Sequence, residues 1–191
     1  YADSGSIDIL RNDGSGTFGG FPITYVAPTY ASSVKLRELN GDGLVDLLWA
    51  DKYPPYSFRW RFNQGGGNFG PTQSSPDVAT CGVTLDDAID AWDFDGDGDL
   101  DPVLMENLAC GGVADKRLFI SENDGAGGMH LQTVIETYLA PFEMMAGDVN
   151  GDGHLDLVVA AHSIEVFLGN GDLTFSSGTV FGSVAARHGV L

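Results

Sequence analysis

Short apolar runs alternate with turns rich in glycine, asparagine and aspartate along the whole chain. Each run has the length of a β-strand, and no long stretch shows the 3.6-residue spacing of an amphipathic helix. The pattern therefore predicts an all-β fold of closely spaced strands. We expect strands at 7–11, 34–39, 45–50, 58–62, 88–94, 100–106, 117–121, 142–149, 155–160 and 164–168.

An acidic motif recurs three times among these strands. It reads ELNGDGLVDLL at 38–48, DFDGDGDLDPV at 93–103 and DVNGDGHLDLV at 148–158. Its copies start at residues 38, 93 and 148, a constant spacing of 55 residues. A fixed period of this length indicates a repeat architecture.

A second motif, a glycine turn that ends on a bulky apolar residue, alternates with the first. It reads NDGSGTF at 12–18, NQGGGNF at 63–69, NDGAGGM at 123–129 and GNGDLTF at 169–175. Each repeat then holds four short antiparallel strands, a pattern typical of β-propeller blades. One such sheet cannot bury both of its faces alone, so each blade must pack on its neighbours.

Together the two motifs resemble the FG-GAP/VCBS repeats of integrin α-chain-like β-propellers. The resemblance covers nearly the whole chain and rests on three copies of D/E-x-D/N-G-D-G-x-x-D. It implies that each acidic loop joins two adjacent strands of one blade and binds calcium, and that the complete ring has seven blades. Glu38 departs from the aspartate that the pattern has at the first loop position.

We therefore predict that residues 1–191 form a single β-propeller domain or a fragment of one, with about three full blades and two partial ones. Residues 1–37 would be a partial blade and linker, 38–92, 93–147 and 148–185 the loop-containing repeats, and 186–191 the start of the next blade. The remaining blades of a larger ring would come from the same or another chain. A closed four-bladed ring is the less favoured alternative.

The acidic loops offer the oxygen ligands that calcium prefers, because alternating positions of a tight loop turn several oxygens toward one centre. Three sites are predicted. The expected ligands are Asp93, Asp95, Asp97, the Asp99 carbonyl and Asp101 in the second loop; Asp148, Asn150, Asp152, the His154 carbonyl and Asp156 in the third; and Glu38, Asn40, Asp42, the Leu44 carbonyl and Asp46 in the first.

Each loop closes at its ninth position between strands, which separates it from a helix-flanked EF-hand. The longer side chain of Glu38 makes the first site the weakest, whereas the second loop carries the most charge. Magnesium fits less well, because it prefers small octahedral sites that retain water. The alternative is a metal-free turn held by hydrogen bonds from side chain to backbone.

The formal charge of −18, from 27 acidic and 9 basic side chains, disfavours binding to nucleic acid or to anionic membranes. Eleven of the 27 carboxylates lie in the three loops, so the charge indicates cation binding first. No apolar stretch approaches the roughly 20 residues that span a bilayer. The chain has no nucleophile elbow, phosphate loop or dinucleotide fingerprint, and its four histidines lack metal-ligand spacing, so we expect no enzyme activity.

Two cysteines flank the second loop, Cys81 12 residues before Asp93 and Cys110 9 residues after Asp101. If the flanking strands pair as a hairpin, the two sulfurs meet near its open end. We therefore favour a disulfide over two buried free thiols, and a disulfide favours an oxidising, extracellular compartment.

An aromatic and proline-rich segment, DKYPPYSFRW, spans residues 51–60. Exposed Tyr53, Tyr56 and Trp60 would stack on a sugar or dock a protein, since recognition residues concentrate on loops over rigid scaffolds. The favoured alternative is that they pack against the neighbouring blade.

These features predict a calcium-binding extracellular or cell-surface β-propeller that serves a structural, adhesive or protein-interaction role. Its partner would be a protein or glycan at the cell surface or in the matrix. Two alternatives stay open. One is a carbohydrate-binding lectin, since some lectins are similar integrin-like propellers, and the other is a non-catalytic propeller part of a larger secreted enzyme.

Overall fold

The computed structural model describes residues 5–27, 30–54, 56–76, 88–106, 109–110, 113–114 and 116–182. Every regular element in these ranges is a β-strand, and the paired strands are antiparallel. Within the same ranges no helix is long and apolar enough to cross a membrane. The predicted all-β class is confirmed.

Three four-stranded sheets make up most of the molecule, and we name them blades 1, 2 and 3. Blade 1 holds β3 (Ala31–Arg37), β4 (Asp46–Asp51), β5 (Phe58–Arg61) and β6 (Gln73–Ser74). Blade 2 holds β7 (Ile89–Trp92), β8 (Asp101–Glu106), β11 (Arg117–Asn123) and β12 (Met129–Glu136). Blade 3 holds β13 (Glu143–Gly147), β14 (Asp156–Ala160), β15 (Ile164–Phe167) and β16 (Thr179–Phe181).

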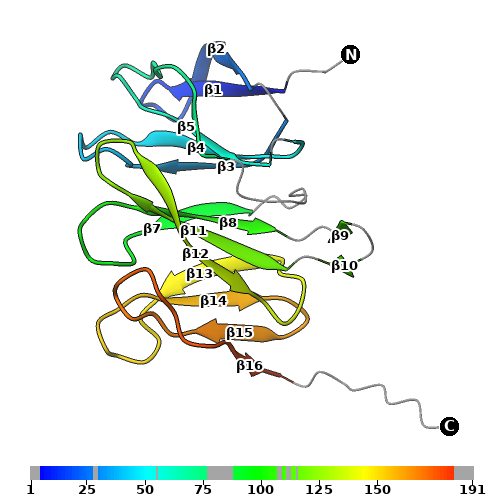
Figure 1. Cartoon of the computed structure of the whole chain (residues 1–191). Coiled ribbons are helices and arrows are strands. Elements are labelled where there is room, and N and C mark those ends of the chain that lie inside the picture. Colours follow the sequence, from blue (N-terminus) through cyan, green and yellow to red (C-terminus); the bar gives the residue numbers. More distant parts are fainter. Residues whose placement is uncertain are drawn as a thin grey trace, which may run out of the picture.

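Two hairpins complete the described strands. One pairs β1 (Ser6–Asn12) with β2 (Phe18–Val26), and the other pairs β9 (Ala109–Cys110) with β10 (Val113–Ala114) between β8 and β11. In Figure 1 the sheets form one stack that runs from the β1–β2 hairpin through blades 1 and 2 to blade 3. Each sheet pairs its strands in chain order, as expected for propeller blades, while closure into a ring stays a prediction.

The two sequence motifs occupy the same two connections in every blade. The acidic loop joins the first strand to the second, and the glycine turn joins the third to the fourth. The residues that close the turns pair across them as Asn12 with Phe18, Asn63 with Phe69, Asn123 with Met129, and Gly169 with Phe175. Each sheet thus begins one strand before its acidic loop, out of phase with the 55-residue sequence period.

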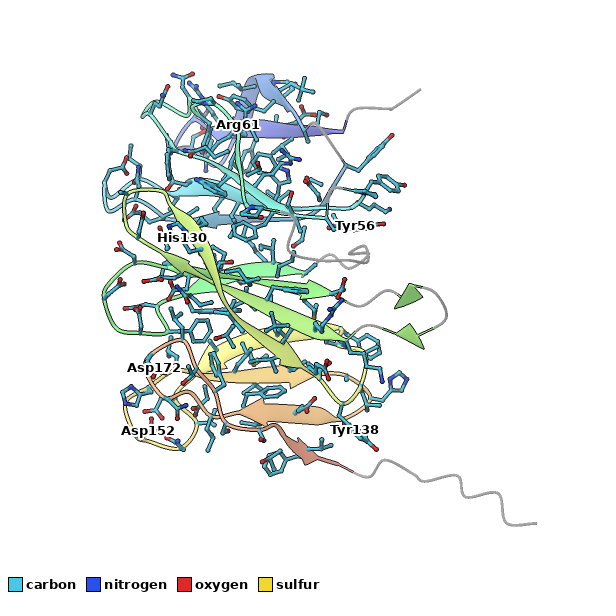
Figure 2. The ribbon with its side chains drawn as sticks, viewed as in Figure 1. Tyr56, Arg61, His130, Tyr138, Asp152 and Asp172 are labelled. Carbon is cyan, nitrogen blue, oxygen red and sulfur yellow. The ribbon has the colours of Figure 1, made fainter. Side chains whose placement is uncertain are left out.

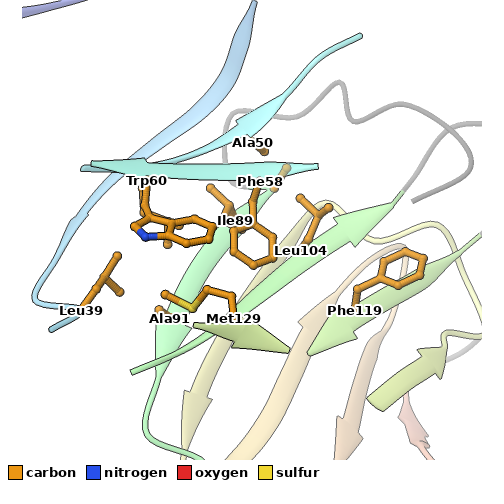
Figure 3. Packing of buried hydrophobic residues seen from close by; sticks show 11 residues of the cluster. Leu39, Ala50, Phe58, Trp60, Ile89, Ala91, Leu104, Phe119 and Met129 are labelled. Carbon is orange, nitrogen blue, oxygen red and sulfur yellow. The ribbon is translucent and has the colours of Figure 1, made fainter. Parts of the chain in front are cut away.

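The second strand is buried on both faces in blades 1 and 2. Every residue of β4 and β8 is buried, because neighbouring sheets cover both sides of these two blades. Leu48, Phe58 and Trp60 of blade 1 share one cluster with Ile89 and Leu104 of blade 2 (Figure 3). The stack is therefore held together by apolar layers between successive sheets.

The same arrangement recurs at the other two junctions. Met105 and Ile120 of blade 2 belong to one buried cluster with Met144 and Val159 of blade 3. A smaller cluster places Ile7 of the hairpin with Leu47 and Trp49 of blade 1. The hairpin therefore packs on blade 1 as each blade packs on the next.

Shortening a side chain in these layers should destabilise the fold. Leu104→Ala should lower the free energy of unfolding by about 2–5 kcal/mol, because it removes fully buried methyl groups and leaves a cavity between blades 1 and 2. Leu131→Ala on β12, where the side chain is 43% exposed, is the matched control. Urea unfolding followed by tryptophan fluorescence measures both, and equal losses would contradict the interblade layer.

Candidate functional site

The last acidic residue of each loop is buried and joins the loop to the glycine turn. Asp46, Asp101 and Asp156 are at most 1% exposed. Their Oδ2 atoms accept the backbone N–H of the second loop residue, namely Leu39 at 2.9 Å, Phe94 at 3.1 Å and Val149 at 2.8 Å. Their Oδ1 atoms accept the N–H that opens the turn, namely Asn63 at 2.7 Å, Asn123 at 3.0 Å and Gly169 at 2.9 Å.

Sequence reasoning assigned these three aspartates to the metal and missed this connecting role. The available signal was the strict alternation of the two motifs, because a loop and a turn that always occur together indicate a contact between them. The contact places both motifs at the same end of each sheet. Figure 2 shows this side of the molecule with Asp152 of the third loop and Asp172 of the last turn, opposite Tyr56 and Tyr138.

The second loop brings three carboxylates to one point. Oxygen atoms of Asp93, Asp95 and Asp101 all lie within 4.8 Å of one another. Asp101 is buried at the base, and the other two side chains are partly exposed. In the part of the chain that the structure describes, this is the one group of three or more histidine, cysteine or acidic side chains placed closely enough to hold a metal ion.

Hydrogen bonds within the second loop fix its shape. Asp93 accepts the backbone N–H of Gly96 at 2.7 Å and of Gly98 at 3.2 Å. Both glycines have positive φ values, 80° and 99°, which a side chain would strain. These bonds hold the turn without a metal, yet each carboxylate oxygen has two lone pairs and can also face a cation.

Burial and like charges make the second loop electrostatically unfavourable on its own. Burial raises the pKa of Asp101 to about 7, although N–H groups of Asn123 and Phe94 oppose the shift, and the charges of Asp95 and Asp97 add to it. Burial also raises the pKa of Asp95, with a further contribution from the charges of Asp97 and Asp93. A cation among these groups would favour their ionised forms.

The acidic side chains of the first loop converge less closely than those of the second loop. Glu38 Oε1 accepts the backbone N–H of Asn40 at 3.0 Å and of Gly41 at 2.8 Å. The Asn40 amide lies 3.3 Å from Asp42 Oδ2, to which it donates. Burial raises the pKa of Asp46, as it does for Asp101 in the second loop.

The third loop has a similar internal network. Asp148 accepts the N–H of Gly151 at 2.6 Å and of Gly153 at 2.9 Å, and the Asn150 amide donates to Asp152 at 2.8 Å. The N–H of His154 lowers the pKa of Asp152, and the Asn150 amide adds to the effect. Among the described side chains of this loop, no three acids converge as they do in the second.

The three residues predicted to offer carbonyl ligands have a defined role through their N–H groups. Leu44, Asp99 and His154 donate to the side chain two positions earlier, at 2.8, 2.9 and 2.9 Å. This bond holds the fifth loop residue in place. Ligation by the three carbonyls stays a prediction.

An open acidic cleft adjoins the second loop. Its volume is about 480 Å³, and its lining includes Asp95 and Asp97 of the loop, Glu122 of β11 and Asp172 of the last glycine turn. The cleft lies where blade 2 meets blade 3, since the Phe94 and Phe175 rings contact edge to face there, with centroids 5.3 Å apart. The acidic end of the stack is thus a continuous surface across these two blades.

The three aromatic residues predicted to contact a partner differ in their exposure to solvent. Trp60 is 3% exposed and lies in the core between blades 1 and 2, and Tyr56 packs against that core. Tyr53 is half exposed and meets Tyr30 edge to face, with ring centroids 5.6 Å apart. Of the three, Tyr53 alone presents a large part of its side chain to solvent.

The predicted disulfide cannot be placed within the residues that the structure describes. Cys81 lies in the undescribed range 77–87, and only the backbone of Cys110, in β9, is described. The pairing of Cys81 with Cys110 therefore stays a prediction. Residues 186–191, expected to start another blade, are likewise outside the described residues.

Comparison with known families agrees with the repeat pattern. Residues 38–104 match an FG-GAP-like repeat, and residues 140–163 match an FG-GAP repeat. A search of curated proteins found no match. The first match spans the acidic loops of blades 1 and 2 with β4, β5, β6, β7 and part of β8, and the second spans the third loop with its flanking strands. With three acidic-loop sheets of the same topology, the chain carries FG-GAP repeats.

Proposed function

We propose that this chain is a calcium-binding, extracellular propeller-like module for adhesion or protein interaction, and that it carries out no catalysis itself. FG-GAP repeats support the module, and the convergence of Asp93, Asp95 and Asp101 supports the calcium. Oxygen atoms within 4.8 Å of one another, on a loop already shaped by its own hydrogen bonds, suit a cation that takes six to eight oxygen ligands.

Bound calcium supplies positive charge where the loop lacks it. Asp101 is buried and its pKa is raised, so its ionised form is costly until a cation compensates it. Asp93 and Asp95 would complete the carboxylate set from the solvent side. Because Asp101 also binds the N–H of Asn123, an ion here stabilises the glycine turn together with the loop.

The three sites should differ in strength. The second loop has the converged acids and should bind first, while the asparagines of the other two loops donate to a neighbouring carboxylate. The first loop should bind most weakly, since Glu38 has a longer side chain than the aspartates at the same position of the other two loops. This order follows ligand charge and preorganisation.

A rigid loop end is the proposed recognition surface. The loops and turns of all blades lie at one end of the sheets, and functional residues concentrate on loops over rigid scaffolds. The acidic cleft of about 480 Å³ between blades 2 and 3 favours a protein partner with basic side chains.

A glycan-binding function is the second candidate. It rests on Tyr53, which is half exposed and lies beside Tyr30 at the end opposite the acidic loops. Burial of Trp60 removes the largest ring from that surface. Binding on a glycan array that is lost in Tyr53→Ala would favour the lectin, whereas an empty array would count against it.

Calcium should stabilise the protein by mass action, and the second loop should dominate its binding. Asp95→Asn should weaken the tightest calcium site by at least about tenfold, because one carboxylate charge leaves the ligand set. Glu136→Gln, on exposed β12, is the matched control and should leave binding unchanged. Isothermal titration measures both, and a calcium titration without heat and without a change in Tm would remove the proposal.

The metal-free protein should lose stability as the pH rises. Because folding raises the pKa of Asp101 from 3.8 to about 7, its contribution is complete below pH 3.8 and is lost as the pH passes through about 7. In EDTA, Tm should therefore fall between pH 5.5 and 8.5, by about 2–4 °C for each kcal/mol lost.

Calcium should reduce this fall, since it stabilises the ionised carboxylate. Asp101→Asn in EDTA serves as the control, because the amide does not titrate, and its Tm should change less over the same range. Thermal melts followed by circular dichroism give both profiles. A metal-free Tm that rises over this range would contradict the assignment to Asp101.

A further inference from the structure

The residue that opens the glycine turn of blade 2 joins two acidic loops. Asn123 is fully buried, and its N–H donates to Asp101 Oδ1 of the second loop at 3.0 Å. Its Oδ1 accepts the N–H of Gly125 at 3.2 Å, and its Nδ2 donates to the Leu100 carbonyl at 3.1 Å. These bonds stay within blade 2. A further bond, from Nδ2 to the Leu39 carbonyl at 2.9 Å, reaches the first loop in blade 1.

Leu39 is held at both of its backbone polar groups. It is the second residue of the first loop and lies between two predicted ligands. Its N–H donates to buried Asp46 at 2.9 Å, and its side chain packs in the apolar cluster shared by blades 1 and 2 (Figure 3). A continuous chain of hydrogen bonds therefore connects the buried aspartates of the two loops, from Asp46 through Leu39 and Asn123 to Asp101.

The corresponding residues of the other two blades do not make this link. Asn63 in blade 1 donates to the Val45 carbonyl of its own loop at 2.9 Å, so its amide does not join the first loop to the second. Blade 3 has Gly169 at this position, and a Cβ there would overlap the Leu155 carbonyl oxygen. Gly169 has no amide to offer the second loop, so the link is specific to the junction between blades 1 and 2.

We propose that Asn123 couples the first two loops, so that calcium in the second loop strengthens the binding of calcium to the first. This coupling rests on the calcium binding proposed above. Asp101, once a cation compensates its buried charge, holds the N–H of Asn123 in place. The Asn123 amide then orders the first loop through the Leu39 carbonyl before that loop receives its own ion. A loop that is already ordered loses less conformational entropy on binding, which gives a positive coupling.

Charge acts in the opposite direction. Burial raises the pKa of Asp99, and the charges of Asp97 in its own loop and of Glu38 in the first loop add to the shift. The two loops therefore sense each other's charge, and cations bound to both would repel. A positive coupling cannot come from this repulsion, so the sign of the coupling identifies the contribution of the hydrogen bonds.

Amide NMR of the whole chain during a calcium titration measures each site separately. In each loop the N–H of the fourth residue donates to the acidic side chain at the first position. The resonances of these residues, Gly41, Gly96 and Gly151, therefore report calcium in the first, second and third loop.

Asp95→Ala/Asp97→Ala empties the second loop with its formal charge matched. Five carboxylates give this loop −5; bound calcium changes the charge to −3, and removal of two carboxylates also gives −3. The first loop should bind calcium at least about fivefold more weakly in this double variant than in the wild type. The third loop should bind equally in both, because Gly169 provides no amide link. An unchanged Gly96 resonance verifies that the second loop stays empty.

Asn123→Ala removes the link, and in this background the double change should alter the affinity of the first loop by less than twofold. Asn63→Ala is the matched control, because Asn63 also accepts the N–H of its turn glycine, Gly65, at 2.9 Å. It should retain the full difference. Thermal melts in calcium check folding, and Asn123→Gly, which copies Gly169 of blade 3, repeats the test if the alanine variant is unfolded.

Three results would overturn the coupling while leaving calcium binding intact. The first is equal affinity of the first loop in the wild type and in Asp95→Ala/Asp97→Ala. The second is equal weakening of the first and third loops, which would indicate a general loss of stability. The third is a difference that persists in Asn123→Ala. Resonances that calcium moves in none of the loops would remove the proposed calcium sites and the coupling with them.

Discussion

A buried carboxylate at the start of the second strand holds the loop end of each blade together. Asp46, Asp101 and Asp156 each accept one backbone N–H from the acidic loop and one from the glycine turn. Two oxygens on one short side chain satisfy donors that lie far apart in the sequence. Left without this acceptor, each buried N–H would cost about 1–3 kcal/mol. The alternation of the two sequence motifs therefore follows from a single contact that every blade repeats.

Buried carboxylates lie at both ends of the strands, and each needs a compensating charge. The surroundings of these carboxylates differ between the two ends. At the end opposite the loops, buried Asp51 is paired with Arg59 and buried Glu106 with Arg117, each at 2.7 Å. Around Asp101 the described residues supply N–H groups and further carboxylates, and its pKa is raised accordingly. Buried acids need a partner of opposite charge. The loop end is thus the end where a bound cation would compensate a buried carboxylate, as Arg59 and Arg117 do at the opposite end.

The parts of the fold that depend on local chemistry could be predicted from the sequence. Glycine at positive φ and aspartate that binds its own backbone specify turns whatever surrounds them, so the loops at Gly96 and the turns at Asn123 were found by spacing alone. Parts that depend on neighbours could not. Trp60 is buried because blade 2 covers that side of β5, and one strand's pattern does not reveal which face a neighbour covers. The convergence of Asp95 with Asp101 likewise depends on side-chain directions that three similar motifs leave open.

The packing between successive sheets gives the stack a direction. Each sheet uses one face to cover its predecessor and the other to receive its successor, and the two faces are built differently. The receiving face is uniformly apolar, as in Val103, Leu118 and Ile120, whereas the covering face of blade 3 includes buried Glu165. An acid is tolerated there because the N–H of Tyr138 in the preceding linker meets it. The repeat therefore fixes where sheets touch, while single positions such as this one adjust the chemistry of each junction.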